Sequence, residues 1–305
     1  MHSTAHRTAL FLCSLPLLLG CSSTEKADDG SEPYYGALTT EREQETLGFY
    51  MTELDARLRA WSRYKLTARN DRDLRTRSLL ENELREKTAE RFDELLVELA
   101  SGPRPNRTIA AMALGFSKND EALGGLVSAL SDRDDGVVAN ALIGLGLLAS
   151  PETPLAQVCF LLGSDPDGYT RTNAAYCVQR ITEVGGRDDC ILEECRFALS
   201  DTEPGVRAQC AATLGRIAEK EDADLLRGLL EDEEPLVIAA AVTALAELSL
   251  RFPEIQGIIG RHLVDSVERI DRTLRGTVFR QLHRLSGEDL GQDLAAWRDW
   301  AYRQD

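Results

Sequence analysis

The sequence predicts an all-α protein, an α-solenoid of about six helix pairs preceded by a long helical hairpin. The main observation is a repeat, in which an acidic turn is followed at a fixed offset by a helical run rich in small residues. The turns begin at Asp132, Asp165, Asp201 and Asp232, which are 33, 36 and 31 residues apart. Self-similarity at a period of about 20–50 residues is typical of stacked-repeat proteins. Aromatic residues make up only 6% of the 305 residues, which favours helix packing through small side chains over a β-sandwich.

Residues 1–20 are typical of a signal peptide. They carry a single charge, on Arg7, and end in a run of twelve mostly apolar residues that is too short to cross a bilayer as a helix. The tetrad LLGC at 18–21 resembles the lipobox of bacterial lipoproteins. The resemblance implies cleavage before Cys21 and a diacyl group on its sulfur. An ordinary secretory signal followed by a chance cysteine is the alternative.

The lipobox resemblance also implies where the protein resides. Ser22 follows the cysteine, and in the sorting rule of Gram-negative lipoproteins this favours the outer membrane. Several acyl chains anchor a protein stably, since each buried methylene contributes about 0.8 kcal/mol. We therefore expect a lipid-anchored protein of the bacterial cell envelope that faces the periplasm. Residues 21–39 are small, acidic and turn-forming without periodicity, which predicts a flexible tether.

The chain is strongly acidic. Its formal net charge is -16, and it becomes -17 without residues 1–20, because only Arg7 is lost. Such a chain repels nucleic acid and anionic lipid head groups, so we expect neither as a partner. The plainer interpretation is that the charge keeps an array rich in Ala and Leu soluble.

Residues 40–101 predict a helical hairpin. Along its first helix, apolar residues recur in steps of four and three and make one seam. Asn70 and Asp71 predict the end of this helix and the N-cap of a second helix, which continues to about Ala100. We expect this hairpin to close the open end of the solenoid; a coiled-coil segment that forms a dimer is the alternative. The seam positions are Leu47, Met51, Leu54, Leu58 and Trp61.

Residues 102–286 hold the repeats. The copies align on a column of mostly small residues, and eight positions before it stands a second column in which arginine recurs. The first column is Gly115, Gly146, Gln179, Gly215, Ala246 and His283, and the second is Arg107, Val138, Arg171, Arg207, Ile238 and Arg275. These runs resemble the second helix of the HEAT repeat, above all the short bacterial HEAT-like repeats of the phycobilisome-lyase type. Residues 201–217 are nearly the family pattern.

The HEAT resemblance implies that the second helices line a concave side and that column arginines bridge to aspartates of a neighbouring repeat. Because the column carries Val138 and Ile238, we expect an interrupted ladder. The segment 287–305 is similar to a closing segment common in bacterial HEAT-repeat proteins. Trp297 and Trp300 fall on one face of a short helix there, and we expect them to cap the array.

The repeats offer one continuous surface for a partner. By helical spacing, two residues of each second helix, from the second pair on, point away from the buried columns, and we expect them to form a partner-binding stripe. Arginine recurs there in an acidic chain, and Tyr and Arg are favoured at binding hot spots. A solvated helix face is the alternative. The stripe is Ile143, Leu147, Tyr176, Arg180, Ala212, Arg216, Thr243, Glu247, Arg280 and Arg284.

Five cysteines lie in the array, and an exported protein meets an oxidising compartment. On an antiparallel helix pair, residues equidistant from the turn face each other. This favours a disulfide between Cys195 and Cys210 and, second, one between Cys177 and Cys190. Cys159 and Cys177 also straddle a turn. Small buried thiols at all five positions are the alternative.

No set of residues predicts catalysis. Without residues 1–20 the chain has two histidines, His262 and His283, too few for a multi-His metal site. The sequence has no Walker loop, no G-x-S-x-G and no H-E-x-x-H motif. We therefore expect no catalytic residues, no metal, no cofactor and no small-molecule substrate.

These observations favour a membrane-anchored scaffold or adaptor of the cell envelope that binds a protein or peptide through its concave face. One alternative is a structural stalk or oligomer former that uses the hairpin at 40–101. Another is an accessory factor of a lyase-like HEAT enzyme. The lyases of that class act on cytoplasmic pigment proteins, whereas this chain has the features of an exported one.

Overall fold

The computed structural model describes residues 46–68 and 70–303, which belong to one compact unit, Glu45–Asp305. These residues form fifteen α-helices, short 3₁₀ turns and no strand, which confirms the all-α solenoid. The expected signal peptide, the lipidation site Cys21 and the tether lie outside the described residues. No helix in the described part of the chain is long and apolar enough to cross a membrane.

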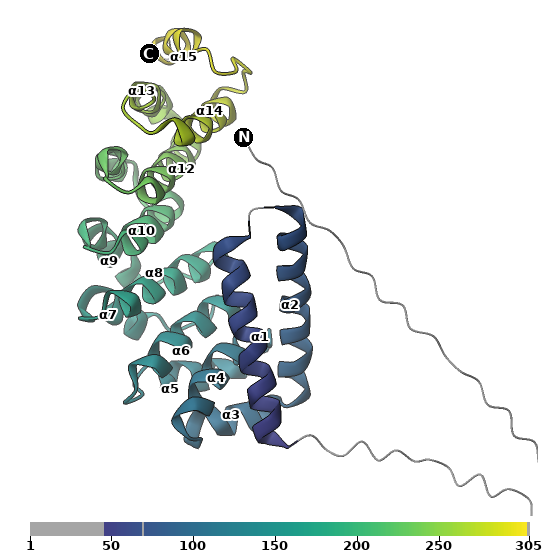
Figure 1. Cartoon of the computed structure of the whole chain (residues 1–305). Helices are drawn as coiled ribbons and strands as arrows, with labels where there is room; N and C mark the ends of the chain where they lie inside the picture. Colours follow the sequence, from purple (N-terminus) through teal and green to yellow (C-terminus); the bar gives the residue numbers. More distant parts are fainter. Residues whose placement is uncertain (1–45, 69, 304–305) are drawn as a thin grey trace, which may run out of the picture. The chain divides into compact units, whose positions relative to one another are not determined.

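Six helix pairs stack in sequence order and build a curved array (Figure 1). In each pair the first helix lies on the outside of the curve and the second on the inside. The pairs are α3 (Phe92–Ser101) with α4 (Arg104–Leu114), α5 (Ala122–Ala129) with α6 (Asp135–Leu148), α7 (Ala156–Ser164) with α8 (Gly168–Glu183), α9 (Asp189–Phe197) with α10 (Pro204–Ile217), α11 (Ala223–Gly228) with α12 (Pro235–Arg251), and α13 (Gln256–Ser266) with α14 (Arg272–Ser286). Short 3₁₀ turns at Ala198–Ser200, Lys220–Asp222, Leu229–Glu231 and Pro253–Ile255 flank the later first helices.

The acidic turns begin the second helices through local hydrogen bonds. The Asp132 carboxylate accepts the Asp134 amide at 2.9 Å, and Asp134 in turn accepts the Gly136 amide at 3.0 Å as the N-cap of α6. Pro204 and Pro235 are the first residues of α10 and α12, where the missing amide hydrogen costs no hydrogen bond. The repeated acidic motif therefore acts as a helix-start signal.

Neighbouring second helices approach each other at their backbones. A Cβ atom on Gly144 of α6 would lie 2.3 Å from the carbonyl oxygen of Ala111 in α4. A Cβ atom on Gly215 of α10 would lie 2.7 Å from the Cα of Ala244 in α12. Both distances are far inside van der Waals contact, so a larger residue cannot be added without separating the helices. Small residues thus set the spacing of the inner layer.

Some column arginines form hydrogen bonds to the next repeat. Three of them donate two hydrogen bonds each to the turn aspartate of the following repeat; the pairs are Arg107 with Asp132, Arg171 with Asp201, and Arg207 with Asp232. Each also donates to a carbonyl at the turn before its own helix, those of Gly102, Asp165 and Asp201. The ladder is interrupted at Val138 and Ile238, as expected from the sequence.

The N-terminal hairpin does not close the end of the array. Its helices are α1 (Leu47–Thr67) and α2 (Asp71–Glu90), and α1 packs on α4 along the inside of the curve (Figure 1). The expected helix at 71–100 breaks at Arg91, where φ is -132° and ψ is 38°. The chain turns there, and α3 becomes the first helix of the first pair. An apolar seam can be buried at an end or along a face, so its pattern did not distinguish the two positions.

The last helix, α15 (Leu294–Tyr302), covers the far end. Trp297 and Trp300 are buried and meet edge to face, with ring centroids 5.8 Å apart. A Cβ atom on Gly260 of α13 would lie 2.8 Å from the Trp300 ring, so the ring lies directly on α13. The two indoles thus keep the apolar face of the last pair from water.

The backbone contact of Gly215 gives a direct stability test. Gly215→Ala should lower the free energy of unfolding by about 1–3 kcal/mol, because the added methyl group forces α10 and α12 apart. Gly276→Ala in α14 is the matched control, since a Cβ atom there meets nothing within 4 Å. The control should be neutral or stabilising by up to about 1 kcal/mol, because it only removes glycine's unfolded-state entropy. Urea unfolding followed by circular dichroism measures both; equal behaviour would contradict the close packing.

The arginine–aspartate ladder predicts that the contribution of Asp232 to the free energy of unfolding depends on pH. Burial alone would raise the pKa of this carboxyl, but hydrogen bonds from Arg207 and from the Glu234 amide outweigh it and lower the pKa below 3.8. The contribution is therefore complete at neutral pH and is lost as the pH falls through the lowered folded pKa. Asp232→Asn should lower the free energy of unfolding by roughly 1–3 kcal/mol at pH 7. It should change this free energy almost not at all at a pH where wild-type Asp232 is protonated. Asp224→Asn, at an 85% exposed carboxylate, should change little at either pH.

Candidate binding surface

The second helices α4, α6, α8, α10, α12 and α14 form one surface on the inside of the curve, here called the inner face (Figure 1). Every residue of the stripe expected from the sequence belongs to a second helix, from α6 to α14. The stripe is not uniformly exposed. Arg280 and Arg284 are exposed, whereas the residues on α6, α8, α10 and α12 are half-buried. The inner face therefore has distinct parts.

Helix α1 covers the first part of the inner face. The Lys65 ammonium lies over the Tyr176 ring of α8, 3.8 Å from its centroid. The Trp61 ring meets Phe116, which follows α4, edge to face at 5.1 Å. Burial raises the pKa of Tyr176 to about 12. Tyr176 is thus part of an internal contact, and the expectation of an exposed anchor for a partner at this position is wrong.

Hydrogen bonds join the hairpin to itself and to the array. The Trp61 Nε1–H donates to Glu81 at 3.0 Å, and the Tyr50 hydroxyl donates to the Lys87 carbonyl at 2.6 Å. The buried Thr88 hydroxyl donates to the carbonyl of Ala113 in α4 at 3.2 Å. The α1 seam is buried within the same chain, which leaves no free seam for the coiled-coil dimer considered above.

The loop after α4 fills the space beside this contact. Lys118 has a left-handed backbone, with φ of 54°, and its ammonium donates to the carbonyls of Leu147 and Leu148 at the end of α6. These are terminal carbonyls that the helix itself cannot satisfy. Leu147 and Ile143 pack against the core from this side. The α6 part of the stripe is therefore structural.

The middle of the inner face is a neutralised ionic network. Arg180 of α8 pairs with Glu183. Arg216 of α10 lies 3.3 Å from Glu183 and 3.9 Å from Glu247 of α12. Each charge in this part has an opposite charge beside it, and the network links three successive repeats. Ala212 and Thr243 supply the small neighbouring positions of the stripe.

A groove borders this network at the ends of the inner helices. Its volume is about 510 Å³, and its walls combine basic, acidic and apolar side chains. One of them, Arg187, donates to the carbonyls of Thr182 and Gly186. The lining residues are Arg187, Asp188, Asp189, Leu192, Arg216, Ile217 and Arg251.

The last part of the inner face, on α14, is basic. Arg280 and Arg284 are exposed, and neither forms an ion pair among the described residues. The only hydrogen bond of their side chains in that part of the chain runs from Arg280 to the Thr277 hydroxyl, at 3.1 Å. Sequence reasoning placed both in the stripe but could not show that their neighbours on α12 and α13 leave them without a carboxylate.

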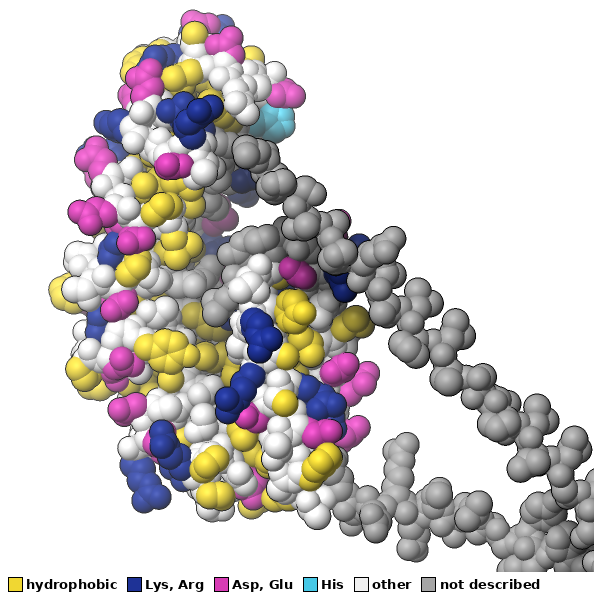
Figure 2. Space-filling model, viewed as in Figure 1, with side chains coloured by type: hydrophobic (Ala, Val, Ile, Leu, Met, Phe, Trp, Pro, Cys, Tyr) yellow, Lys and Arg dark blue, Asp and Glu magenta, His cyan; other side chains and the backbone are white. Residues whose placement is uncertain are grey.

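The outer face is the competing surface. Figure 2 shows hydrophobic side chains, in yellow, on the outer helices at the left of the view. Phe160 of α7 and Phe197 of α9 are 60% and 72% exposed. Large exposed apolar side chains can mark a contact surface when they are contiguous. Any test of the inner face therefore needs a control on the outer face.

Comparison with known proteins identifies the repeats. A family model described as HEAT repeats matches residues 92–179 and 195–254. The chain therefore contains HEAT repeats. The matched ranges contain the second helices α4, α6, α10 and α12 and most of α8, whose columns of small residues and arginines carried the resemblance in the sequence.

Individual relatives agree with this family. Phycocyanin operon protein Y of Pseudanabaena tenuis (strain PCC 7409) is 29% identical over 164 residues, 52% of this chain and 37% of that protein. The chain therefore spans little more than a third of the curated relative that it matches. A crystal structure of the karyopherin Kap121p bound to the extreme C-terminus of the phosphatase Cdc14p matches with a TM-score of 0.55, at 15% identity over 78% of this chain and 29% of that one. An engineered protein matches with a TM-score of 0.50, at 20% identity over 64% and 98%. These two structures show the fold alone.

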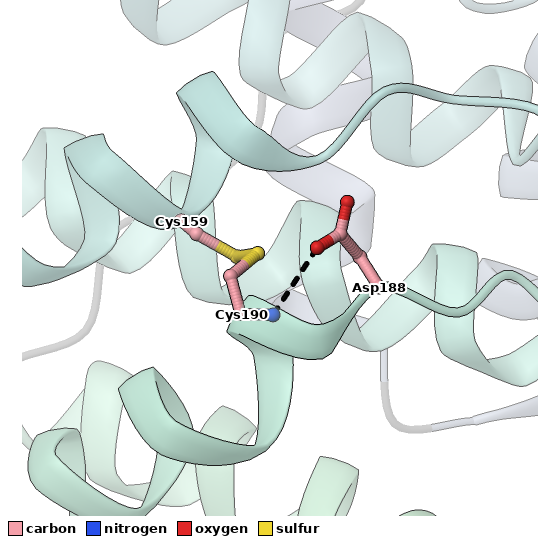
Figure 3. The surroundings of a disulfide bond; sticks show 3 residues. All are labelled: Cys159, Asp188 and Cys190. Atoms are coloured by element: carbon pink, nitrogen blue, oxygen red, sulfur yellow. Dashed lines mark hydrogen bonds between the residues drawn. A yellow bond between two sulfur atoms is a disulfide. The ribbon is translucent and has the colours of Figure 1, made fainter.

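The HEAT array contains a disulfide between successive first helices. Cys159 of α7 is bonded to Cys190 of α9, with Cα atoms 6.2 Å apart (Figure 3). The Asp188 carboxylate accepts the Cys190 amide at 3.1 Å and caps α9 at the bond. The expected pairs, Cys195 with Cys210 and Cys177 with Cys190, are wrong as disulfides.

The reason for the error is geometric. The expected pairs assumed two antiparallel helices joined by one turn, whereas α7 and α9 are equivalent helices of neighbouring repeats. The separation of 31 residues between Cys159 and Cys190 is near the spacing of 36 residues between the Asp165 and Asp201 turns of these two repeats, and this was the available signal. The Cys195 side chain and burial raise the pKa of the Cys210 thiol. Burial also raises the pKa of Cys177. Cys177, Cys195 and Cys210 are free and buried.

The cysteine pattern makes a quantitative prediction. In the denatured, unreduced protein, three of the five array cysteines should react with an alkylating reagent, and all five after reduction. Reduction should lower the free energy of unfolding by about 3–4 kcal/mol, the loop-closure contribution for 31 residues. Peptide mapping by mass spectrometry and urea unfolding measure the two effects. A mapped Cys195–Cys210 bond, or five reactive thiols before reduction, would overturn this assignment.

Proposed function

We propose that this HEAT-repeat protein is a binding scaffold of the bacterial cell envelope, which captures a protein or peptide on the open part of its inner face. The observation that carries the proposal is the position of the hairpin. Helix α1 occupies the inner face as far as α8, while α12 and α14 lie beyond it (Figure 1). The chain itself therefore demonstrates that this face accommodates a helix, and no described helix lies over the inner side of α12 and α14.

The proposed location rests on the N-terminal sequence. The LLGC tetrad supports acylation of Cys21, with residues 1–20 removed and Ser22 directing the protein to the outer membrane. A tether of residues 21–39 would place the array away from the bilayer. At about 3.3 Å per extended residue, such a segment reaches on the order of 60 Å. The partner would then lie in the periplasm within that reach.

An accessory role beside a lyase-type HEAT protein is the second candidate. Its support is the similarity to phycocyanin operon protein Y, which covers about half of this chain. A relative matched over 37% of its own length supports a shared repeat more strongly than a shared partner. A stalk built from the hairpin has less support, because the α1 seam is buried inside the chain.

Site-specific photocrosslinking tests the proposed surface. A photoreactive amino acid at Thr243, on α12 of the inner face, should give a discrete protease-sensitive adduct in intact cells. The same residue at Phe197, on the outer face, should not give that adduct. An adduct from Phe197 alone, or none from Thr243, would refute the inner face as the binding surface.

In parallel, Cys21→Ala should abolish palmitate labelling and membrane retention if Cys21 carries the anchor.

A further inference from the structure

Helix α14 is basic within an acidic protein. Between Arg272 and Ser286 it contains four arginines and no aspartate or glutamate, while the whole chain has a formal charge of -16. None of the four forms an ion pair among the described residues. Three of them are exposed and one is half-buried; they are Arg272, Arg280 and Arg284, and Arg275.

The earlier repeats show how this fold normally treats an arginine on the inner face. Arg216 of α10 has Glu183 on one side and Glu247 on the other. One repeat later, Arg284 holds the stripe position that Glu247 holds in α12. Charge compensation along the inner face therefore ends at α12, and Arg280 and Arg284 are left for a carboxylate from outside the described chain.

The column arginine of the last repeat, Arg275, also lacks the aspartate partner that earlier column arginines have. Arg207 donates two hydrogen bonds to Asp232 in the next turn. Arg275 occupies the same column but is followed by no further repeat turn, and its Nε is buried without a hydrogen-bond partner in the described structure. Buried polar groups without partners are uncommon in native proteins. The guanidinium groups of α14 therefore form no ion pair with any described carboxylate, although Arg275 acts electrostatically on Asp271.

The chemistry of these groups selects the ligand. Guanidinium binds carboxylate through paired, charge-assisted hydrogen bonds. A long polyanion, such as nucleic acid or an anionic membrane, would also meet the repulsion of the remaining negative charge. A short acidic segment meets mainly the local patch, because charges beyond the Debye length of about 8 Å are screened.

The spacing adds a further constraint. Arg280 and Arg284 are one helical turn apart, about 6 Å along the axis at 1.5 Å per residue. Alternate residues of an extended peptide are about 6.6 Å apart and point to the same side. Two acidic residues separated by one residue therefore match the two arginines.

We propose that the partner captured on the inner face presents an acidic peptide segment, whose carboxylates bind Arg280 and Arg284. This inference rests on the proposed function and specifies the chemistry of its partner. It assigns the α12–α14 end of the inner face as the docking site, with Arg216 and Glu247 as a neutral border.

Selection from a library of short random peptides tests the inference. The mature chain without its acyl groups should enrich peptides with an excess of Asp and Glu, often separated by one residue. Arg280→Gln with Arg284→Gln should weaken binding of the selected peptides about fivefold, the effect expected of two partly exposed ion pairs. The matched control, Arg227→Gln with Arg269→Gln, removes the same charge from α11 and from the turn after α13, outside the stripe, and should change binding less than about twofold.

The outcomes separate the inference from the proposed function. Enrichment of peptides without an acidic bias, or equal loss in both double variants, would overturn the acidic partner but leave peptide binding intact. Failure to enrich any peptide, together with no adduct from Thr243, would refute the proposed function itself. Flotation with phosphatidylglycerol vesicles that depends on Arg280 and Arg284, without acidic peptide enrichment, would assign the patch to lipid and also overturn the inference.

Discussion

The structure depends on backbone-close packing of the second helices. Gly144 approaches the Ala111 carbonyl and Gly215 approaches Ala244, and neither position has room for a methyl group. Such contacts fix the distance between repeats to within a few tenths of an ångström, because dense interiors do not absorb added volume. With that distance fixed, Arg207 of one repeat reaches Asp232 of the next with two hydrogen bonds. The small-residue column thus makes the charged column possible.

The same packing explains why the inner face has three parts. Helix α1 lies on the first part, where Trp61 meets Phe116 and Lys65 lies over the Tyr176 ring. Beyond α1 the face carries the paired charges of Arg216 and Glu247, and then the arginines of α14, which form no ion pair with any residue that the structure describes. The two ends of the inner face therefore differ because the hairpin covers only one of them. The repeat motif itself is the same at both ends.

The sequence predicts well what is local or periodic. The Asp134 cap, the proline at the start of α10 and the interruption of the arginine ladder at Val138 all follow from a single repeat and its neighbour. It predicts poorly which surfaces meet across the array. The exposure of Tyr176 depends on the direction in which the chain turns at Arg91, and helical periodicity carries no information on that direction.

Periodicity can also be misapplied, and the disulfide is the example. Cys159 and Cys190 lie on equivalent first helices of adjacent repeats, so the contact that joins them is set by the stack and not by a turn. The same reasoning applies to charge. A residue's equivalents one repeat away form its surroundings in a solenoid, so an arginine must be judged against the next helix of the stack as well as its own. Among the described residues Arg216 has carboxylate partners and Arg284 has none, although both are arginines at stripe positions of second helices. The difference appears only when neighbouring repeats are compared, and it distinguishes a structural arginine from one available to a partner.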